Sequence, residues 1–314
     1  APDRQGSARQ VVIQLIPFPF SQGWVDNVRT LARSHWYDGT AITRVQDNYV
    51  VQWGDPHGDE AERAKPVPDG LITVPETCYT ITLDVTPCTF PEFASDQSTQ
   101  EMARAAADAL NEEKRDVARK ASTPSPSSPS PDVKNTQTRN APEGWHQRDP
   151  YVSWVEFYKG WPIASDTVEY DDQFAQFWPV HCYGMVGVGR GYSPDTGTGA
   201  ELYTVIGHAP RHLDRNIALV GRVVMGMEHL TSLPRGTGPL GFYEDEAQHV
   251  PILSIRLASD LPEAEQPRLQ FLSSNSESFD AYMDARANRR DAFFNHSAGG
   301  IDICNAPPPI RQAQ

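Results

Sequence analysis

Residues 26–56, DNVRTLARSHWYDGTAITRVQDNYVVQWGDP, decide the fold that this sequence predicts. Their first part is apolar at every third or fourth position. This spacing predicts a short amphipathic helix, capped at Asp26 or Asn27 and ended by the break at Asp38 and Gly39. The apolar side of the helix consists of Val28, Leu31, Ala32 and His35. The later part is rich in β-branched and aromatic residues, which predicts two strands.

The two predicted strands carry one cation and one amide among apolar neighbours. Arg44 belongs to the first strand and Gln52 to the second. A guanidinium is costly to bury because it has many donors to satisfy and cannot lose its charge. We therefore single out Arg44 as a candidate functional residue.

This stretch resembles the cyclophilin family of peptidyl-prolyl isomerases. The family signature has a Tyr-Asp-Gly turn, an Arg-Val strand, an aromatic residue and a Gln-X-Gly-Asp segment. The matching elements here are residues 37–39, Arg44 with Val45, Tyr49, and residues 52–55. A second ordered match follows downstream, in GAELY at 199–203, in Leu213 with Asp214, and in VGRVVMGM at 220–227. Together the two matches cover roughly residues 10–57 and 181–232.

The resemblance implies a mainly β fold, a closed antiparallel eight-stranded barrel capped by two helices. We expect the barrel in residues 1–245, interrupted by a partly helical insertion at about 59–180. Residues 246–314 form a C-terminal extension packed on the barrel. Within the insertion, Ser98 and Glu101 predict the start of a surface helix that runs to about Lys120.

Two segments of the insertion have a biased composition. Residues 121–144 are rich in Pro and Ser and lack core-forming side chains, which predicts a flexible tether. Residues 145–178 are rich in aromatic side chains. Packing of the insertion onto the barrel explains them better than an aromatic ligand groove does, although both remain open.

The function implied by the resemblance is cis–trans isomerisation of X-Pro bonds, and the catalytic residue is Arg44. The guanidinium would donate a hydrogen bond to the prolyl nitrogen and so weaken the amide resonance. Substrate-binding positions carried over from the family are Tyr49, Val50, Gln52, Gly189, Glu201, Tyr203, His212, Leu213 and Ile217. Small residues around Gly189 would let a substrate backbone approach closely.

Several of these positions depart from the family pattern. Glu201 stands where glutamine is usual, and it would either pair with Arg44 or compete with substrate for it. Tyrosines replace phenylalanines at 49 and 203, His212 replaces tryptophan, and Ile217 stands where histidine is common. We predict slow to moderate activity. The alternative is a non-catalytic peptide- or protein-binding module on the same scaffold.

The composition limits the classes of partner that this protein is expected to bind. A net charge of −14 without a long basic run argues against nucleic acid and against an anionic membrane surface. No apolar stretch is long enough to cross a bilayer. The nine histidines are scattered, so we expect no metal and no cofactor. The partners that we expect are proline-containing segments of client proteins.

The four cysteines suggest an oxidising compartment. Pairing Cys182 with Cys304 would tie the C-terminal extension to the barrel. Pairing Cys78 with Cys88 requires a turn between them, because a straight strand would hold them roughly 30 Å apart. A chain that starts at Ala1 rather than Met also fits a processed, extracytoplasmic protein.

Overall fold

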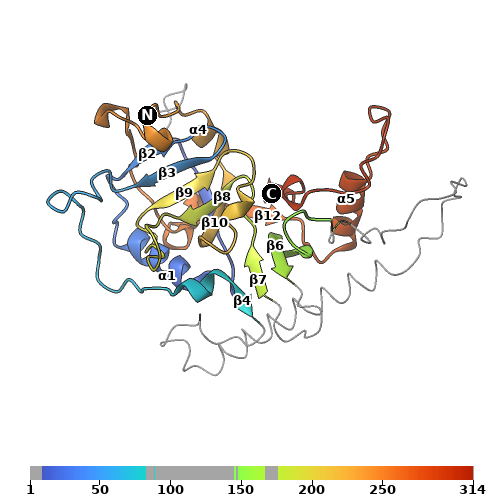
Figure 1. Ribbon diagram of the computed structural model, residues 1–314, viewed down its shortest axis with the longest axis horizontal. Coiled ribbons are helices and arrows are strands. Elements are labelled where there is room, and N and C mark those ends of the chain that lie inside the picture. The colour runs from blue at the N-terminus through green and yellow to red at the C-terminus, as the bar shows by residue number, and fades with distance from the viewer. Residues whose placement is uncertain (1–8, 83–87, 89–144, 146–147, 167–175, 314) are drawn as a thin grey trace, which may run out of the picture.

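The computed structural model describes residues 9–82, 88, 145, 148–166 and 176–313. This part of the chain is mainly β, and its largest element is a seven-stranded antiparallel sheet that curls as a half-barrel (Figure 1). The strands, in spatial order, are β1 (Val12–Leu15), β10 (Leu219–Met225), β8 (Met185–Val188), β9 (Leu202–Val205), β3 (Val50–Gly54), β2 (Ala41–Val45) and β11 (Val250–Pro251). Closure into an eight-stranded barrel stays a prediction.

Helix α1 (Gln22–Arg33) packs its apolar side into the main core. Leu31 is fully buried and Trp24 donates from Nε1 to the carbonyls of Thr196 and Gly197, each at 3.1 Å. The predicted start at residue 26 or 27 is wrong, because Asn27 lies inside the helix. Its amide group exchanges two hydrogen bonds with the backbone of Ile72 instead of capping the helix.

His35 does not belong to the buried side of this helix, contrary to the prediction. It lies two residues beyond Arg33, the last helical residue, is exposed, and has a left-handed backbone with φ of 58°. The chain turns away there because that conformation cannot continue a helix. The second helix of the sheet region, α4 (Met227–Thr231), has only five residues.

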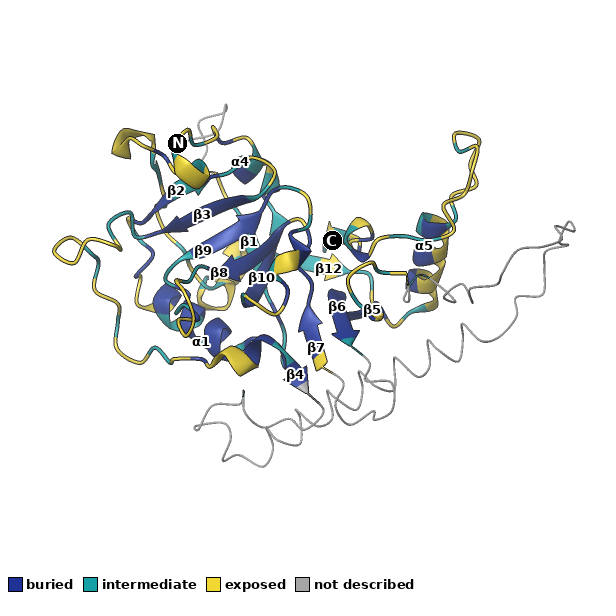
Figure 2. Ribbon diagram, in the orientation of Figure 1, coloured by how far each residue is buried: buried dark blue, intermediate teal, exposed yellow. Residues whose placement is uncertain are grey.

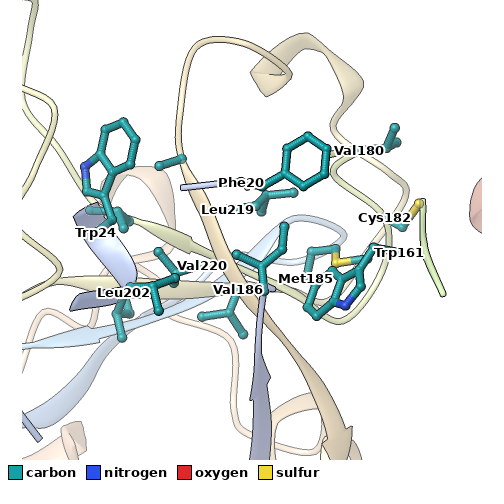
Figure 3. Close-up of a cluster of buried hydrophobic side chains, with 14 of the residues drawn as sticks. Phe20, Trp24, Trp161, Val180, Cys182, Met185, Val186, Leu202, Leu219 and Val220 are labelled. Carbon is teal, nitrogen blue, oxygen red and sulfur yellow. The ribbon is translucent and has the colours of Figure 1, made fainter. Parts of the chain in front are cut away.

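A second antiparallel sheet comes from the segment predicted as an insertion. Its four strands are β4 (Ile81–Thr82), β7 (Gln176–Pro179), β6 (Trp161–Asp166) and β5 (Trp154–Tyr158). Trp161, Phe177 and Trp178 of this sheet are buried in one cluster with α1 and the seven-stranded sheet. Strands β6 and β7 are largely buried (Figure 2), and Trp161 lies beside Met185 of β8 (Figure 3). These three aromatic residues therefore serve packing, whereas Tyr151 is exposed, and Tyr170 and Phe174 lie outside the described residues. The predicted surface helix and the tether at 121–144 lie outside the described residues.

The C-terminal part contains strands β12 (Leu269–Phe271) and β13 (Ile310–Gln312), paired with each other, and helix α5 (Glu277–Ala287). Phe279 of α5 meets Phe157 of β5 edge to face, with ring centroids 5.2 Å apart. The disulfide between Cys182 and Cys304 links this part to the segment before β8. The residues that form this extension thus share the main core, while the predicted domain boundaries stay a prediction.

The second disulfide joins Cys78 and Cys88, whose Cα atoms are 5.3 Å apart. Cys78 lies in a short 3-10 helix (Glu76–Tyr79) rather than in a strand. Among the residues that the model describes, no helix combines the length and hydrophobicity that crossing a bilayer requires.

Candidate functional site

The strand register brings the predicted site residues onto one face of the large sheet. Arg44 on β2 pairs with Gln52 on β3, Gln52 pairs with Tyr203 on β9, and Tyr203 pairs with Gly187 on β8. Residues directly opposite each other on antiparallel strands project to the same side. The register also shifts between Ile42 and Arg44, an irregularity of the kind that re-aims a side chain.

Arg44 is half-buried and held on several sides. Its Nε donates to the carbonyl of Leu240 at 2.7 Å and its Nη1 to Oε1 of Gln52 at 2.8 Å, while Nη2 donates to Oε1 of Gln46. The guanidinium lies over the rings of Tyr49, at 5.6 Å, and Phe242, at 5.3 Å. Burial lowers the pKa of Arg44, but a guanidinium stays charged at any physiological pH. The remaining N–H groups on Nη1 and Nη2 have no acceptor within the described chain.

A small apolar cluster, separate from the main core, lies beside Arg44. Its buried members are Val50, Tyr203 and Val205. Partly buried Tyr49, Leu213 and Ile217 pack against them. We call these six residues the Tyr203 cluster. Tyr49 belongs both to this cluster and to the contacts of Arg44, so the cation and the apolar surface are adjacent.

A buried polar chain anchors Tyr203. Its hydroxyl lies 2.9 Å from Nε2 of His181, and Nδ1 of His181 lies 2.9 Å from Oδ1 of Asp214. Arg211 donates to Asp214 at 2.6 Å and to Asp149 at 2.7 Å. Because Nδ1 of His181 faces a carboxylate it carries the proton, so Nε2 accepts from the Tyr203 hydroxyl. The hydroxyl is thus satisfied inside the protein.

Electrostatics favour a neutral Tyr203 and an ionised Asp214. Burial raises the pKa of the Tyr203 hydroxyl, which therefore remains a donor. Burial opposes ionisation of Asp214, but the hydrogen bonds from His181 and Arg211 and the charge of Arg211 outweigh it, so the pKa of Asp214 is lowered. Asp214 is consequently a carboxylate that orients His181.

Glu201 is connected to Arg44 through Gln52. Gln52 accepts from Arg44 with Oε1 and donates from Nε2 to Oε1 of Glu201. Of the two expected roles, direct pairing with Arg44 is therefore not what the structure shows. Burial raises the pKa of Glu201, although the Gln52 hydrogen bond and the charge of Arg44 oppose that rise. The amide of Gln52 is fixed in orientation, because its oxygen faces a cation and its nitrogen a carboxyl group.

Comparison with known proteins identifies the family. A sequence model of the cyclophilin type peptidyl-prolyl cis-trans isomerases matches residues 23–257, three quarters of the chain. This chain is a member of the cyclophilin family. The crystal structure of cyclophilin AquaCyp293 from Hirschia baltica is similar in fold, with a TM-score of 0.56 at 18% identity, covering 97% of this chain and 88% of that one. The comparison with curated proteins gave no match.

The family and the similar structure confirm the predicted mainly β, cyclophilin-like fold and the prediction of an isomerase. The matched range contains every predicted catalytic and substrate-binding residue of this cyclophilin. The structure brings most of them together around Arg44 and Tyr203. His212, which is exposed, stacks on the ring of Tyr49 with centroids 6.3 Å apart.

Gly187 of β8 and Gly189, which directly follows that strand, make room for side chains of this cyclophilin. A Cβ atom at Gly187 would lie 2.3 Å from Cζ and the hydroxyl oxygen of Tyr203. A Cβ atom at Gly189 would lie 2.8 Å from Cγ and Oε2 of Glu201. The space beside Gly189, expected to admit a substrate backbone, is thus partly filled by Glu201.

A group of potential metal ligands lies outside this site. His57, Glu60 and Glu246 place one ligand atom each within 4.8 Å of one another. The side chain of Arg63 already occupies the group, 2.8 Å from Nε2 of His57 and 3.0 and 3.3 Å from the two carboxylates. These described residues form an exposed ion-pair cluster whose cation is the protein's own.

Several residues of the site could not be predicted from the sequence. Leu240 and Phe242, which hold Arg44, come from a loop almost two hundred positions away that belongs to no predicted strand. His181 is one of the scattered histidines, and its sequence context predicts no contact with Tyr203. Its place in the loop between β7 and β8, shortly before a segment that matches the family, is the one clue that could have linked it to the site.

Proposed function

We propose that this cyclophilin isomerises X-Pro bonds with Arg44 as the catalytic residue and the Tyr203 cluster as the surface for the proline ring. The barrier to rotation, about 20 kcal/mol, comes from resonance of the amide. It falls when the prolyl nitrogen becomes pyramidal and accepts a hydrogen bond in the twisted state. No proton has to be transferred and no bond has to be broken.

The observation that carries the proposal is the restraint of Arg44 beside an apolar cluster. Three acceptors and two rings fix the guanidinium, and N–H groups on Nη1 and Nη2 remain for a ligand. A donor positioned in advance stabilises the transition state without being reordered during the reaction. The rate should be nearly independent of pH in the neutral range, because Arg44 stays charged.

Gln52 would hold a substrate carbonyl through its Nε2 group, as the resemblance implies. That group already donates to Glu201, so a substrate carbonyl has to compete with a carboxyl group for it. This competition supports the expectation of slow to moderate activity.

We further propose that the protein acts outside the cytoplasm, on proline-containing segments of client proteins whose folding it assists. Its two disulfides are consistent with an oxidising compartment. The other candidate function is a peptide-binding module without turnover, which the occupied donor of Gln52 favours.

A protease-coupled assay on a proline peptide tests Arg44. One charge-assisted hydrogen bond contributes about 1.5–3 kcal/mol, so Arg44→Ala should lower kcat/KM by about 10- to 150-fold. Arg44→Lys keeps the charge but not the planar set of donors, and it should also lose most of the activity. An unchanged rate in Arg44→Ala would refute this role. No turnover in either the wild type or Glu201→Gln, with peptide binding retained, would support the binding module.

A further inference from the structure

Glu201 has an unusual position for a carboxyl group. Its side chain is half-buried beside the site. Among the residues that the structure describes, only Gln52 donates a hydrogen bond to this carboxyl group. No lysine, arginine or histidine of that part of the chain lies within ion-pair distance of it. A carboxylate has room for several donors, so Oε2 of Glu201 is left to accept from a ligand.

The nearby cations, Arg44 and Arg190, donate their hydrogen bonds to groups other than Glu201. Arg44 donates to Gln52, Gln46 and the carbonyl of Leu240. Arg190, which follows Gly189, donates to the carbonyls of Asn216 and Gly191. Asp59 adds a second negative charge that acts on Glu201. The electrostatic environment of this carboxyl group thus favours a positive charge supplied from outside.

The register places Glu201 within reach of a peptide bound at the Tyr203 cluster. Glu201 directly precedes β9 and lies two residues from Tyr203, and alternation along a strand puts both on one face. Two residues of a strand span roughly 6.7 Å. An extended peptide advances about 3.3–3.6 Å per residue. A side chain within two residues of the bound proline therefore comes close to Glu201.

We infer that Glu201 is a specificity-determining residue that selects substrates with a lysine or arginine within two residues of the proline. The inference rests on the proposed function in one respect, the position of the proline ring at the Tyr203 cluster. An ammonium or guanidinium group would pair with Oε2 of Glu201 in a partly desolvated position. There an ion pair is screened less than on the open surface.

The test is a peptide series with one proline and a single variable residue. Lysine, norleucine or glutamate is placed in turn at the two positions before and the two after proline. Norleucine keeps the straight apolar chain of lysine without its charge. Both kcat/KM and Kd, the latter from fluorescence anisotropy, are measured for the wild type and for Glu201→Gln. Glu263→Gln, the same exchange at an exposed carboxylate of the C-terminal part, is the control.

At one of the four peptide positions, lysine should bind to the wild type about tenfold more tightly than norleucine, equivalent to about 1.4 kcal/mol. Glutamate at that position should bind more weakly than norleucine. Glu201→Gln should reduce this preference to within about twofold, and Glu263→Gln should retain it. Added salt should weaken the preference. Absence of any charge preference in the wild type, or its persistence in Glu201→Gln, would overturn the inference. A charge preference in Kd without turnover would support it while refuting the proposed catalysis.

Discussion

The Tyr203 hydroxyl offers a sharp test of the buried polar chain. The exchange Tyr203→Phe removes one oxygen atom and leaves the ring in the apolar cluster. Nε2 of His181, 1% exposed, then loses its donor, since Nδ1 faces Asp214. We expect lower stability with little change in activity, because only the ring of Tyr203 belongs to the surface proposed for proline.

The size of the effect follows from the burial of His181. A buried acceptor without a partner costs about 1–3 kcal/mol, and we take about 2 kcal/mol for this one. With a urea m-value of about 3 kcal/mol per molar, the unfolding midpoint should fall by about 0.7 M. The value of kcat/KM should stay within about threefold, a change of less than 1 kcal/mol in the activation free energy.

Urea unfolding followed by tryptophan fluorescence measures the first quantity, and the coupled peptide assay the second. Tyr192→Phe is the matched control, because Tyr192 is 96% exposed and its exchange should leave both quantities unchanged. An unchanged midpoint in Tyr203→Phe together with a tenfold loss of activity would refute the reasoning. The hydroxyl would then contact the substrate rather than anchor the ring.

Three further predictions concern other parts of the fold. The Cys182–Cys304 disulfide closes a loop of 122 residues, so replacing both cysteines by serine should cost roughly 5 kcal/mol and lower Tm in a calorimetric scan. The hydrogen bonds from Arg256 lower the pKa of Asp38 to about 2. The ionised Asp38 should therefore stabilise the folded protein by about 1 kcal/mol after allowance for solvent screening. This contribution is present above the unfolded pKa of an aspartate and is lost as the pH falls toward 2. Denaturant titrations at several pH values measure this contribution as the difference in unfolding free energy between the wild type and Asp38→Asn. Gly187→Ala should displace the neighbouring tyrosine ring, costing about 1–3 kcal/mol and weakening peptide binding in anisotropy titrations.

Each of these has a contrary result. A disulfide-free variant within about 1 kcal/mol of the wild type would show that the loop-entropy argument fails here. For Asp38→Asn, equal destabilisation at pH 2 and pH 7 would exclude the ion pair with Arg256 as the cause. Wild-type peptide affinity in Gly187→Ala would mean that the tyrosine ring adjusts without disturbing the site.

The sequence by itself determined the elements around Arg44. Alternation in residues 41–54 placed Arg44 and Gln52 in two neighbouring strands, and the apolar spacing before them predicted the helix that packs on the core. These features depend on local periods of two and of three to four residues, which can be read without a partner strand. The spacing and order of these residues also sufficed for the family resemblance, and hence for the predicted fold.

Only the tertiary structure decided how the side chains contact one another. Leu240 and Phe242 hold Arg44, His181 anchors Tyr203, and Glu201 receives its hydrogen bond from Gln52 rather than from Arg44. Each contact joins residues that are far apart in the sequence, and each depends on strand register and on packing of distant segments. Local periodicity shows that a segment is a strand but not which distant residues it pairs with. A register shift of one position would leave the periodicity unchanged and give every residue of the strand a different partner.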